Sequence, residues 1–163
     1  VRGMVSYETM REIAKTFGGV EHRIELIRTR DGVRWYNDSI ASSPSRTIAG
    51  LNSFPEKVIL IAGGKDKGIS YAPLGPVVND RVKLLLLCGK TAGVIREAGG
   101  QAEKYKGLGI LDVADYHEAV FIADARSQPG DVVILSPAST SFDRFANFME
   151  RGQVFKAIVN ELK

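Results

Sequence analysis

Four short polar segments each follow an apolar run typical of a buried strand, and they carry the side chains most able to do chemistry. The segments combine hydroxyls, lysines, backbone amides and a carboxylate, and they lie at 37–44, 63–68, 88–91 and 136–141. Ammonium and hydroxyl groups bind carboxylates and phosphates. Ligands of open α/β sheets bind outside the carboxyl ends of the strands. The sequence therefore predicts a site for a small dicarboxylate or phosphate ligand at one sheet edge.

Each segment also has a purely structural interpretation. In this interpretation residues 37–39 make a turn and cap the next helix, and Gly63-Gly64 let the chain turn beside solvated lysines. The hydroxyls of 136–141 then serve as helix caps. Their common position favours the binding interpretation, because separate turns rarely gather so many polar side chains at one edge.

Other catalytic and metal motifs find little support. Gly89-Lys90-Thr91 imitates the end of a phosphate-binding loop, but that loop needs a glycine where this chain has Leu84 inside a strand. A helix start capped by Thr91 or Gly89 is the better interpretation. His22 and His117 have no cysteine or second histidine at metal-ligand spacing, so no zinc site is expected.

Alternating patterns of apolar residues indicate the elements that must position these segments. We expect strands at 23–30, 33–36, 57–62, 82–87, 109–111 and 131–135. We expect helices at 6–17, 44–51, 73–78, 91–98, 115–125 and 150–162. Asp31-Gly32 is a strong hairpin signal. The fold class is therefore α/β: a Rossmann-like mixed, mostly parallel sheet flanked by helices, with a leading antiparallel hairpin.

Composition limits the class of protein further. A chain of 163 residues with 44% hydrophobic and 25% charged residues suits one domain, 1–163, in which 1–19 form a lead-in helix from a preceding domain boundary. The net charge of +3 is too small and too dispersed to predict nucleic-acid binding. No run approaches the roughly 20 apolar residues of a membrane span. The single Cys88 favours a reduced, cytoplasmic protein, and the start at Val1 suggests a piece of a longer chain.

Four ordered groups of residues resemble the C-terminal domain of the Mur ligases, and most of all that of the member that adds D-glutamate. They are Glu21-His22-Arg23, Trp35-Tyr36-Asn37-Asp38-Ser39, Gly63-Gly64-Lys65-Asp66-Lys67, and 135–143 with Phe148 and Arg151-Gly152. The resemblance covers nearly the whole chain in the expected order. It implies ATP-dependent amide-bond formation in peptidoglycan precursor synthesis, with D-glutamate, ATP and UDP-N-acetylmuramoyl-L-alanine as the substrates of a monomeric full enzyme.

By match to the family, this domain would bind D-glutamate. Ser42, Lys67 and Ser141 would bind its carboxylates, with help from the backbone amide of Phe148. One departure matters: many members have lysine where this chain has Ile40, which cannot bind an anion. Its role is then absent or taken by a neighbour such as Lys65 or Arg46.

The same match assigns four residues to ATP. Arg23 and Asp38 would contact the nucleotide, with Asp38 accepting from the ribose hydroxyls, and His22 and Asn37 would lie at the same site. The family's phosphate loop and magnesium ligands belong to a central domain that this chain lacks. The resemblance therefore implies ATP and Mg²⁺ as cofactors but no catalytic residue or metal ligand here, and we expect the domain alone to be inactive.

Two other functions remain open from the sequence. One is a related ligase acting on another acidic amino acid, such as a folylpolyglutamate-type enzyme, although the 136–148 run argues against it. The other is a free-standing nucleotide- or anion-binding module of flavodoxin-like shape, which predicts a gene that begins and ends with this domain.

Overall fold

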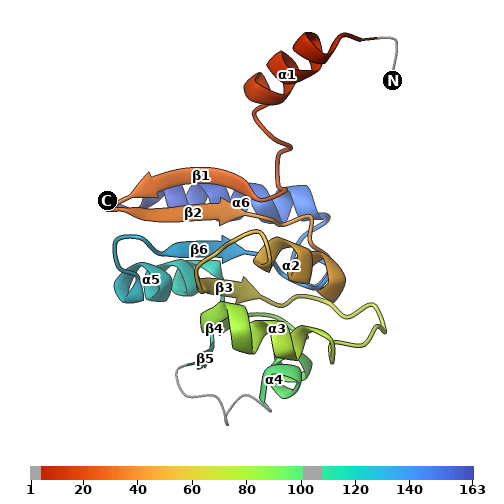
Figure 1. Ribbon diagram of the computed structural model, residues 1–163. Coiled ribbons are helices and arrows are strands. Elements are labelled where there is room, and N and C mark those ends of the chain that lie inside the picture. Colours follow the sequence, from red (N-terminus) through yellow and green to blue (C-terminus); the bar gives the residue numbers. More distant parts are fainter. Residues whose placement is uncertain (1–4, 101–107) are drawn as a thin grey trace.

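Six strands form one mixed sheet in the order β1-β2-β6-β3-β4-β5 (Figure 1). The structure is a computed structural model that describes residues 5–100 and 108–163. The strands are β1 (Glu25–Arg30), β2 (Val33–Asn37), β3 (Val58–Ala62), β4 (Val82–Leu87), β5 (Gly109–Asp112) and β6 (Val132–Leu135). Only β1 runs antiparallel to its neighbour, and the other pairs are parallel. The predicted fold class is therefore confirmed.

The leading hairpin forms where the sequence predicts it. Asp31 and Gly32 both have positive φ, 49° and 78°, as a two-residue hairpin turn of the primed type requires. A Cβ on Gly32 would also lie 3.0 Å from Cβ of Pro129. Glycine is thus needed here for both conformation and space.

The described residues form six helices, of which the last five cover both faces of the sheet. They are α1 (Tyr7–Thr16), α2 (Pro44–Leu51), α3 (Leu74–Arg81), α4 (Ala92–Gly100), α5 (Tyr116–Arg126) and α6 (Phe148–Glu161). Alternate residues of the strands point to opposite faces. One face packs against α5 and α6, and the other packs against α2, α3 and α4. The central strands β3, β4 and β6 are therefore buried on both sides, as their continuous apolar sequences predict.

Helix α1 stands apart from this sheet (Figure 1). The Ser6 side chain caps it by accepting a hydrogen bond from the Thr9 amide, but the helix has no buried residue. Ile13 and Phe17 remain largely exposed on its apolar side. No helix in the described part of the chain is long and apolar enough to cross a membrane.

Five of the six helices start one or two residues away from the predicted position, and capping explains the largest difference, that of α6. Asn147 accepts a hydrogen bond from the Glu150 amide, so α6 begins at Phe148, two residues before the predicted start. Helix α4 begins at Ala92, and Thr91 Oγ1 accepts a hydrogen bond from the Gly64 amide at 3.0 Å. Thr91 thus ties two loops together.

Candidate ligand-binding cleft

A cleft of about 490 Å³ runs beside α2 at the edge where β2 and β3 end. The turn before β1, the loop after β2 and the loop after β3 supply its other walls. Its lining residues are Arg23, Ile24, Asp38, Ile40, Ala41, Ser42, Ser43, Arg46, Ala49, Gly50, Ser53 and Lys67. Three of these side chains are cationic and one is a carboxylate. The cleft therefore offers a net positive surface to a small anion.

Lys67 and Ser42 meet at one end of this cleft. Lys67 Nζ donates a hydrogen bond to Ser42 Oγ at 3.3 Å, and the lysine side chain is exposed. The two residues come from loops that follow β3 and β2. An ammonium beside a hydroxyl can bind one carboxylate through two hydrogen bonds, so the sequence prediction correctly brings this pair together.

Asp38 forms a buried acidic wall further along the cleft. Its Oδ1 accepts from the Ile24 amide at 3.3 Å, and its Oδ2 accepts from Ser136 Oγ at 2.8 Å. Burial raises the pKa of the Asp38 carboxyl to about 6 despite these hydrogen bonds and the nearby Arg23 and Arg46. An ionised carboxylate has about four acceptor positions, so Asp38 retains capacity for ligand hydroxyls.

The backbone around Asp38 is shaped to hold that carboxylate. Ile24 has φ 45°, a left-handed conformation that strains a β-branched residue, and this conformation accompanies its hydrogen bond to Asp38. Gly50 of α2 lies on the other side, and a Cβ there would be 2.9 Å from Asp38 Oδ2. The strained backbone of Ile24 and the absence of a side chain at Gly50 thus both help to position the Asp38 carboxylate.

Asn37 and His22 lie in a buried network behind the cleft. Their side chains are hydrogen-bonded at 2.8 Å between Asn37 Nδ2 and His22 Nδ1, and Asn37 Nδ2 also donates to Glu25 at 3.1 Å. Neither residue lines the described cleft. Their assignment to ATP stays a prediction, and in this arrangement they support the loop that carries Asp38.

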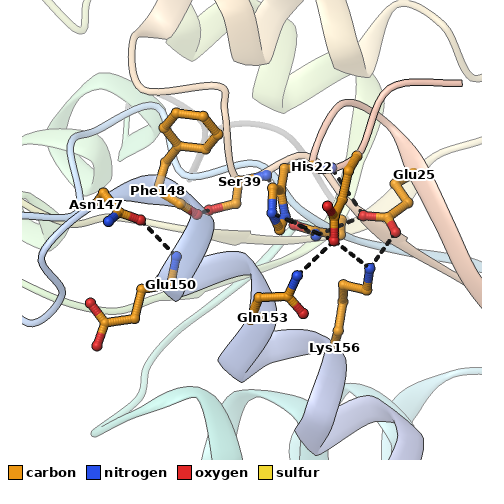
Figure 2. Close-up of polar contacts among 10 residues, drawn as sticks. His22, Glu25, Ser39, Asn147, Phe148, Glu150, Gln153 and Lys156 are labelled. Atoms are coloured by element: carbon orange, nitrogen blue, oxygen red, sulfur yellow. Dashed lines mark hydrogen bonds and ion pairs between the residues drawn. The ribbon is translucent and has the colours of Figure 1, made fainter.

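Side chains of α6 complete this network (Figure 2). Lys156 donates to Glu25 at 2.5 Å and to Glu21 at 3.0 Å, while Gln153 donates to Glu21 at 2.6 Å. The Lys156 contacts lower the pKa of the exposed Glu21 carboxyl. Burial by itself would raise the pKa of the Glu25 carboxyl, but the Lys156 contacts together with hydrogen bonds from the His22 amide and Asn37 lower it.

The same network bears on metal binding. Among the residues that the structure describes, Glu21, His22 and Glu25 place potential ligand atoms within 4.8 Å of one another. The Lys156 ammonium already contacts both glutamates, and Asn37 engages His22. These residues therefore do not fit a divalent cation.

Arg151 is a residue that sequence reasoning assigned no role. It is 0% exposed, and it donates to Ser39 Oγ at 2.9 Å, to the Ser39 carbonyl at 2.7 Å and to the Ser139 carbonyl at 3.0 Å. Ser39 Oγ in turn donates to the Phe148 carbonyl at 2.7 Å. Arg151 thus joins the loops after β2 and β6 to the start of α6. The sequence feature that could have indicated this role is the position of Arg151 on the apolar face of the predicted helix.

Ser141 and Phe148 do not line the cleft with Lys67 and Ser42. Ser141 is only 2% exposed, and the half-buried Phe148 ring packs edge-on against His22 with centroids 5.9 Å apart. The loop of Ser141 nevertheless pairs with the Lys67 loop, because the Lys65 and Thr140 backbones exchange hydrogen bonds of 2.9 and 3.0 Å. Direct contact of Ser141 and Phe148 with D-glutamate stays a prediction.

Gly63 and Gly64, in the segment after β3, lie where the backbone packs too closely for a side chain. A Cβ on Gly63 would lie 1.8 Å from the Cys88 carbonyl oxygen, and one on Gly64 would lie 2.2 Å from that of Thr140. The 136–141 hydroxyls do not cap a helix directly, since α6 starts at Phe148. Lys90 faces a different cleft of about 460 Å³.

Comparison with known proteins decides the family. Residues 22–139, more than half of the chain, match the family model described as "Mur ligase, glutamate ligase domain". The chain belongs to the Mur ligase family. The matched segment contains all the residues that line the cleft.

Curated Mur ligases match along almost the whole chain. UDP-N-acetylmuramoylalanine--D-glutamate ligase of Ruminiclostridium cellulolyticum is 54% identical over 98% of this chain, and that of Acetivibrio thermocellus is 55% identical over 98%. In both cases the match covers 35% of the relative. The chain therefore spans about a third of the length of the curated relatives it matches.

Solved structures share the fold at low sequence identity. UDP-N-acetylmuramate-alanine ligase from Thermotoga maritima aligns with a TM-score of 0.65 and 12% identity over 93% of this chain and 33% of that chain. Bifunctional folylpolyglutamate synthase/dihydrofolate synthase from Yersinia pestis aligns with a TM-score of 0.66 and 17% identity over 94% and 34%. The Mur ligase domain thus has a fold common to several ligases.

Proposed function

We propose that this domain is the C-terminal part of an ATP-dependent ligase that adds D-glutamate to UDP-N-acetylmuramoyl-L-alanine. The observation that carries the proposal is the cleft in which Lys67 and Ser42 lie at one end and buried Asp38 lies further along. A cation–hydroxyl pair suits a carboxylate, and a carboxylate suits ribose hydroxyls. The names of relatives about 54% identical support the choice of D-glutamate.

The proposed reaction has two steps. A carboxylate oxygen of the nucleotide-sugar substrate attacks the γ-phosphorus of ATP, which forms an acyl phosphate and releases ADP. The D-glutamate nitrogen then attacks the acyl carbon, inorganic phosphate leaves, and the nitrogen loses a proton to give the amide. This domain would contribute by holding the amino acid so that its amine faces the acyl carbon, which is catalysis by positioning.

ATP and a divalent metal complete the proposal. Arg23 and Asp38 would contact the nucleotide, and His22 and Asn37 would hold the Asp38 loop from behind. A folylpolyglutamate synthase/dihydrofolate synthase of related fold has been solved with AMPPNP and a manganese ion, which supports ATP and a metal. Mg²⁺ would be bound outside this domain and would offset charge on the phosphates.

The test uses the full-length protein that contains this chain. We expect it to release phosphate from ATP only when both UDP-N-acetylmuramoyl-L-alanine and D-glutamate are present. Equal release with L-glutamate, or release with a folate acceptor instead of the nucleotide sugar, would replace the proposed function. The 163-residue domain alone should release no phosphate, because it supplies only part of the closed site.

A further inference from the structure

The cleft runs along one face of helix α2. Arg46, Ala49, Gly50 and Ser53 all line it, and their spacing places them on one face along the helix and its C-terminal end. The Lys67–Ser42 pair lies at the start of α2, whereas Gly50, next to Asp38, lies about one turn beyond Arg46. Arg46 therefore stands between the two ends of the cleft.

The Arg46 guanidinium is available to a ligand. Among the described residues, no hydrogen bond or ion pair engages its side chain, and the residue is exposed. Asp38 is the one carboxylate among the described residues that line the cleft, and it already accepts hydrogen bonds from the Ile24 amide and Ser136. Ile40 also lines the cleft but is apolar, so Arg46 is the cation that the cleft-facing side of α2 supplies.

We propose that Arg46 binds the phosphate groups that lie between the nucleoside and the amino acid. This inference rests on the proposed function, in which ribose hydroxyls lie at Asp38 and an amino-acid carboxylate lies at Lys67 and Ser42. The group that must cross the space between them is the phosphate chain or the acyl phosphate made from it. A guanidinium binds phosphate oxygens through two parallel hydrogen bonds, so Arg46 would fix the phosphate without taking part in bond breaking.

The test compares two ligands that differ in their phosphates. Full-length wild-type protein and Arg46→Ala are titrated with AMPPNP and with adenosine, and both dissociation constants are measured by calorimetry. We expect the wild type to bind AMPPNP more tightly than adenosine. Arg46→Ala should lose roughly 10- to 100-fold in AMPPNP affinity, as expected for charged hydrogen bonds, while adenosine affinity stays the same. Arg46→Lys should recover part of the loss.

Arg126→Ala, at the exposed end of α5, is the matched control and should bind both ligands as the wild type does. Equal loss for AMPPNP and adenosine in Arg46→Ala would overturn the proposal, as would no loss for either or a wild type without preference for AMPPNP. Turnover assays keep the two proposals apart. A protein that lacks D-glutamate-dependent turnover but shows the phosphate-specific loss contradicts the proposed function and supports the role of Arg46.

Discussion

Lys67 Nζ lies 3.3 Å from Ser42 Oγ, across the two loops that follow β3 and β2. These strands are not neighbours, because β6 lies between them in the sheet. The β6 loop is correspondingly buried, and it bonds to both sides through Ser136–Asp38 and Thr140–Lys65. The buried β6 loop thus supports the loops after β2 and β3 on either side of it.

The first prediction concerns two residues assigned to the carboxylates of D-glutamate, Lys67 and Ser141. Lys67→Ala should raise the KM for D-glutamate roughly 10- to 100-fold or abolish turnover, since it removes a charged hydrogen bond to the ligand. The fold should persist, because the Lys67 side chain is exposed. Ser141→Ala should also abolish turnover, because Ser141 is assigned to the same ligand; its hydroxyl is buried, so the fold of this variant is checked as well. Steady-state kinetics and far-UV circular dichroism measure both effects.

Lys90→Ala provides the matched control, because Lys90 is also an exposed lysine after a strand but faces another cleft. It should leave the KM for D-glutamate unchanged. Full activity in both Lys67→Ala and Ser141→Ala would contradict their assignment to the substrate.

The arrangement of loops could be predicted because it follows from local signals. The Asp31-Gly32 turn, continuous apolar strands and intervening helices together require a mostly parallel sheet, and parallel strands place their following loops at one edge. The Lys67–Ser42 contact is a consequence of that geometry. The central, buried place of Ser141 could not be predicted, because strand order is set by tertiary packing.

The supporting residues were also beyond sequence reasoning. Arg151 has three hydrogen bonds to residues at least 12 positions away in the chain, and Tyr71 bonds to Ser139 from a distance of 68 positions. No local pattern encodes such partners. An arginine on a predicted apolar helix face was a hint of burial, but it did not indicate the Ser39 loop as its partner.

The second prediction is a pH dependence from Asp38. Its folded pKa of about 6 lies above the ordinary value of 3.8, so the folded protein holds this proton more tightly than the unfolded chain. The free energy of unfolding should therefore fall as pH rises from about 4 to about 6, by about 3 kcal/mol from this group. Urea denaturation of the wild type and Asp38→Asn across that range measures the difference.

The asparagine isolates the Asp38 contribution from those of other acids. Its carbonyl oxygen can still accept from the Ile24 amide, and its amide can donate to Ser136. The stability of Asp38→Asn relative to the wild type should thus increase with pH. Parallel pH profiles for the two proteins would show that burial does not disfavour the Asp38 charge.

The third prediction concerns Gly50. Replacing glycine by alanine inside a helix usually raises the free energy of unfolding by about 0.5–1 kcal/mol. At Gly50 the new Cβ would lie 2.9 Å from Asp38 Oδ2, so the carboxylate must move. We expect Gly50→Ala to gain little or no stability and to bind AMPPNP more weakly, as measured by denaturation and calorimetry.

Gly93→Ala in α4 is the control for that substitution, because nothing lies within 4 Å of its added Cβ. It should show a gain of up to about 1 kcal/mol with no change in ligand affinity. If Gly50→Ala instead behaves like Gly93→Ala in both measurements, Asp38 does not need the space beside α2.

The fourth prediction concerns Tyr71, at the end of the loop that carries Lys67. Its hydroxyl lies 2.9 Å from Ser139 Oγ, which lies 2.8 Å from Thr91 Oγ1. The other end of the loop is held by the Lys65–Thr140 backbone pairing. Tyr71→Phe removes one anchor of this loop, so it should lower the free energy of unfolding by about 1 kcal/mol and raise the KM for D-glutamate several-fold.

The KM is the decisive measurement for Tyr71, because a purely structural hydroxyl would change stability alone. Tyr7→Phe, on exposed α1, removes a hydroxyl of the same kind and should change neither quantity. Loss of stability in Tyr71→Phe with an unchanged KM for D-glutamate would mean that the loop holds Lys67 without this anchor. A raised KM for D-glutamate with an unchanged KM for ATP would instead show that the buried hydroxyl chain positions the amino-acid end of the cleft.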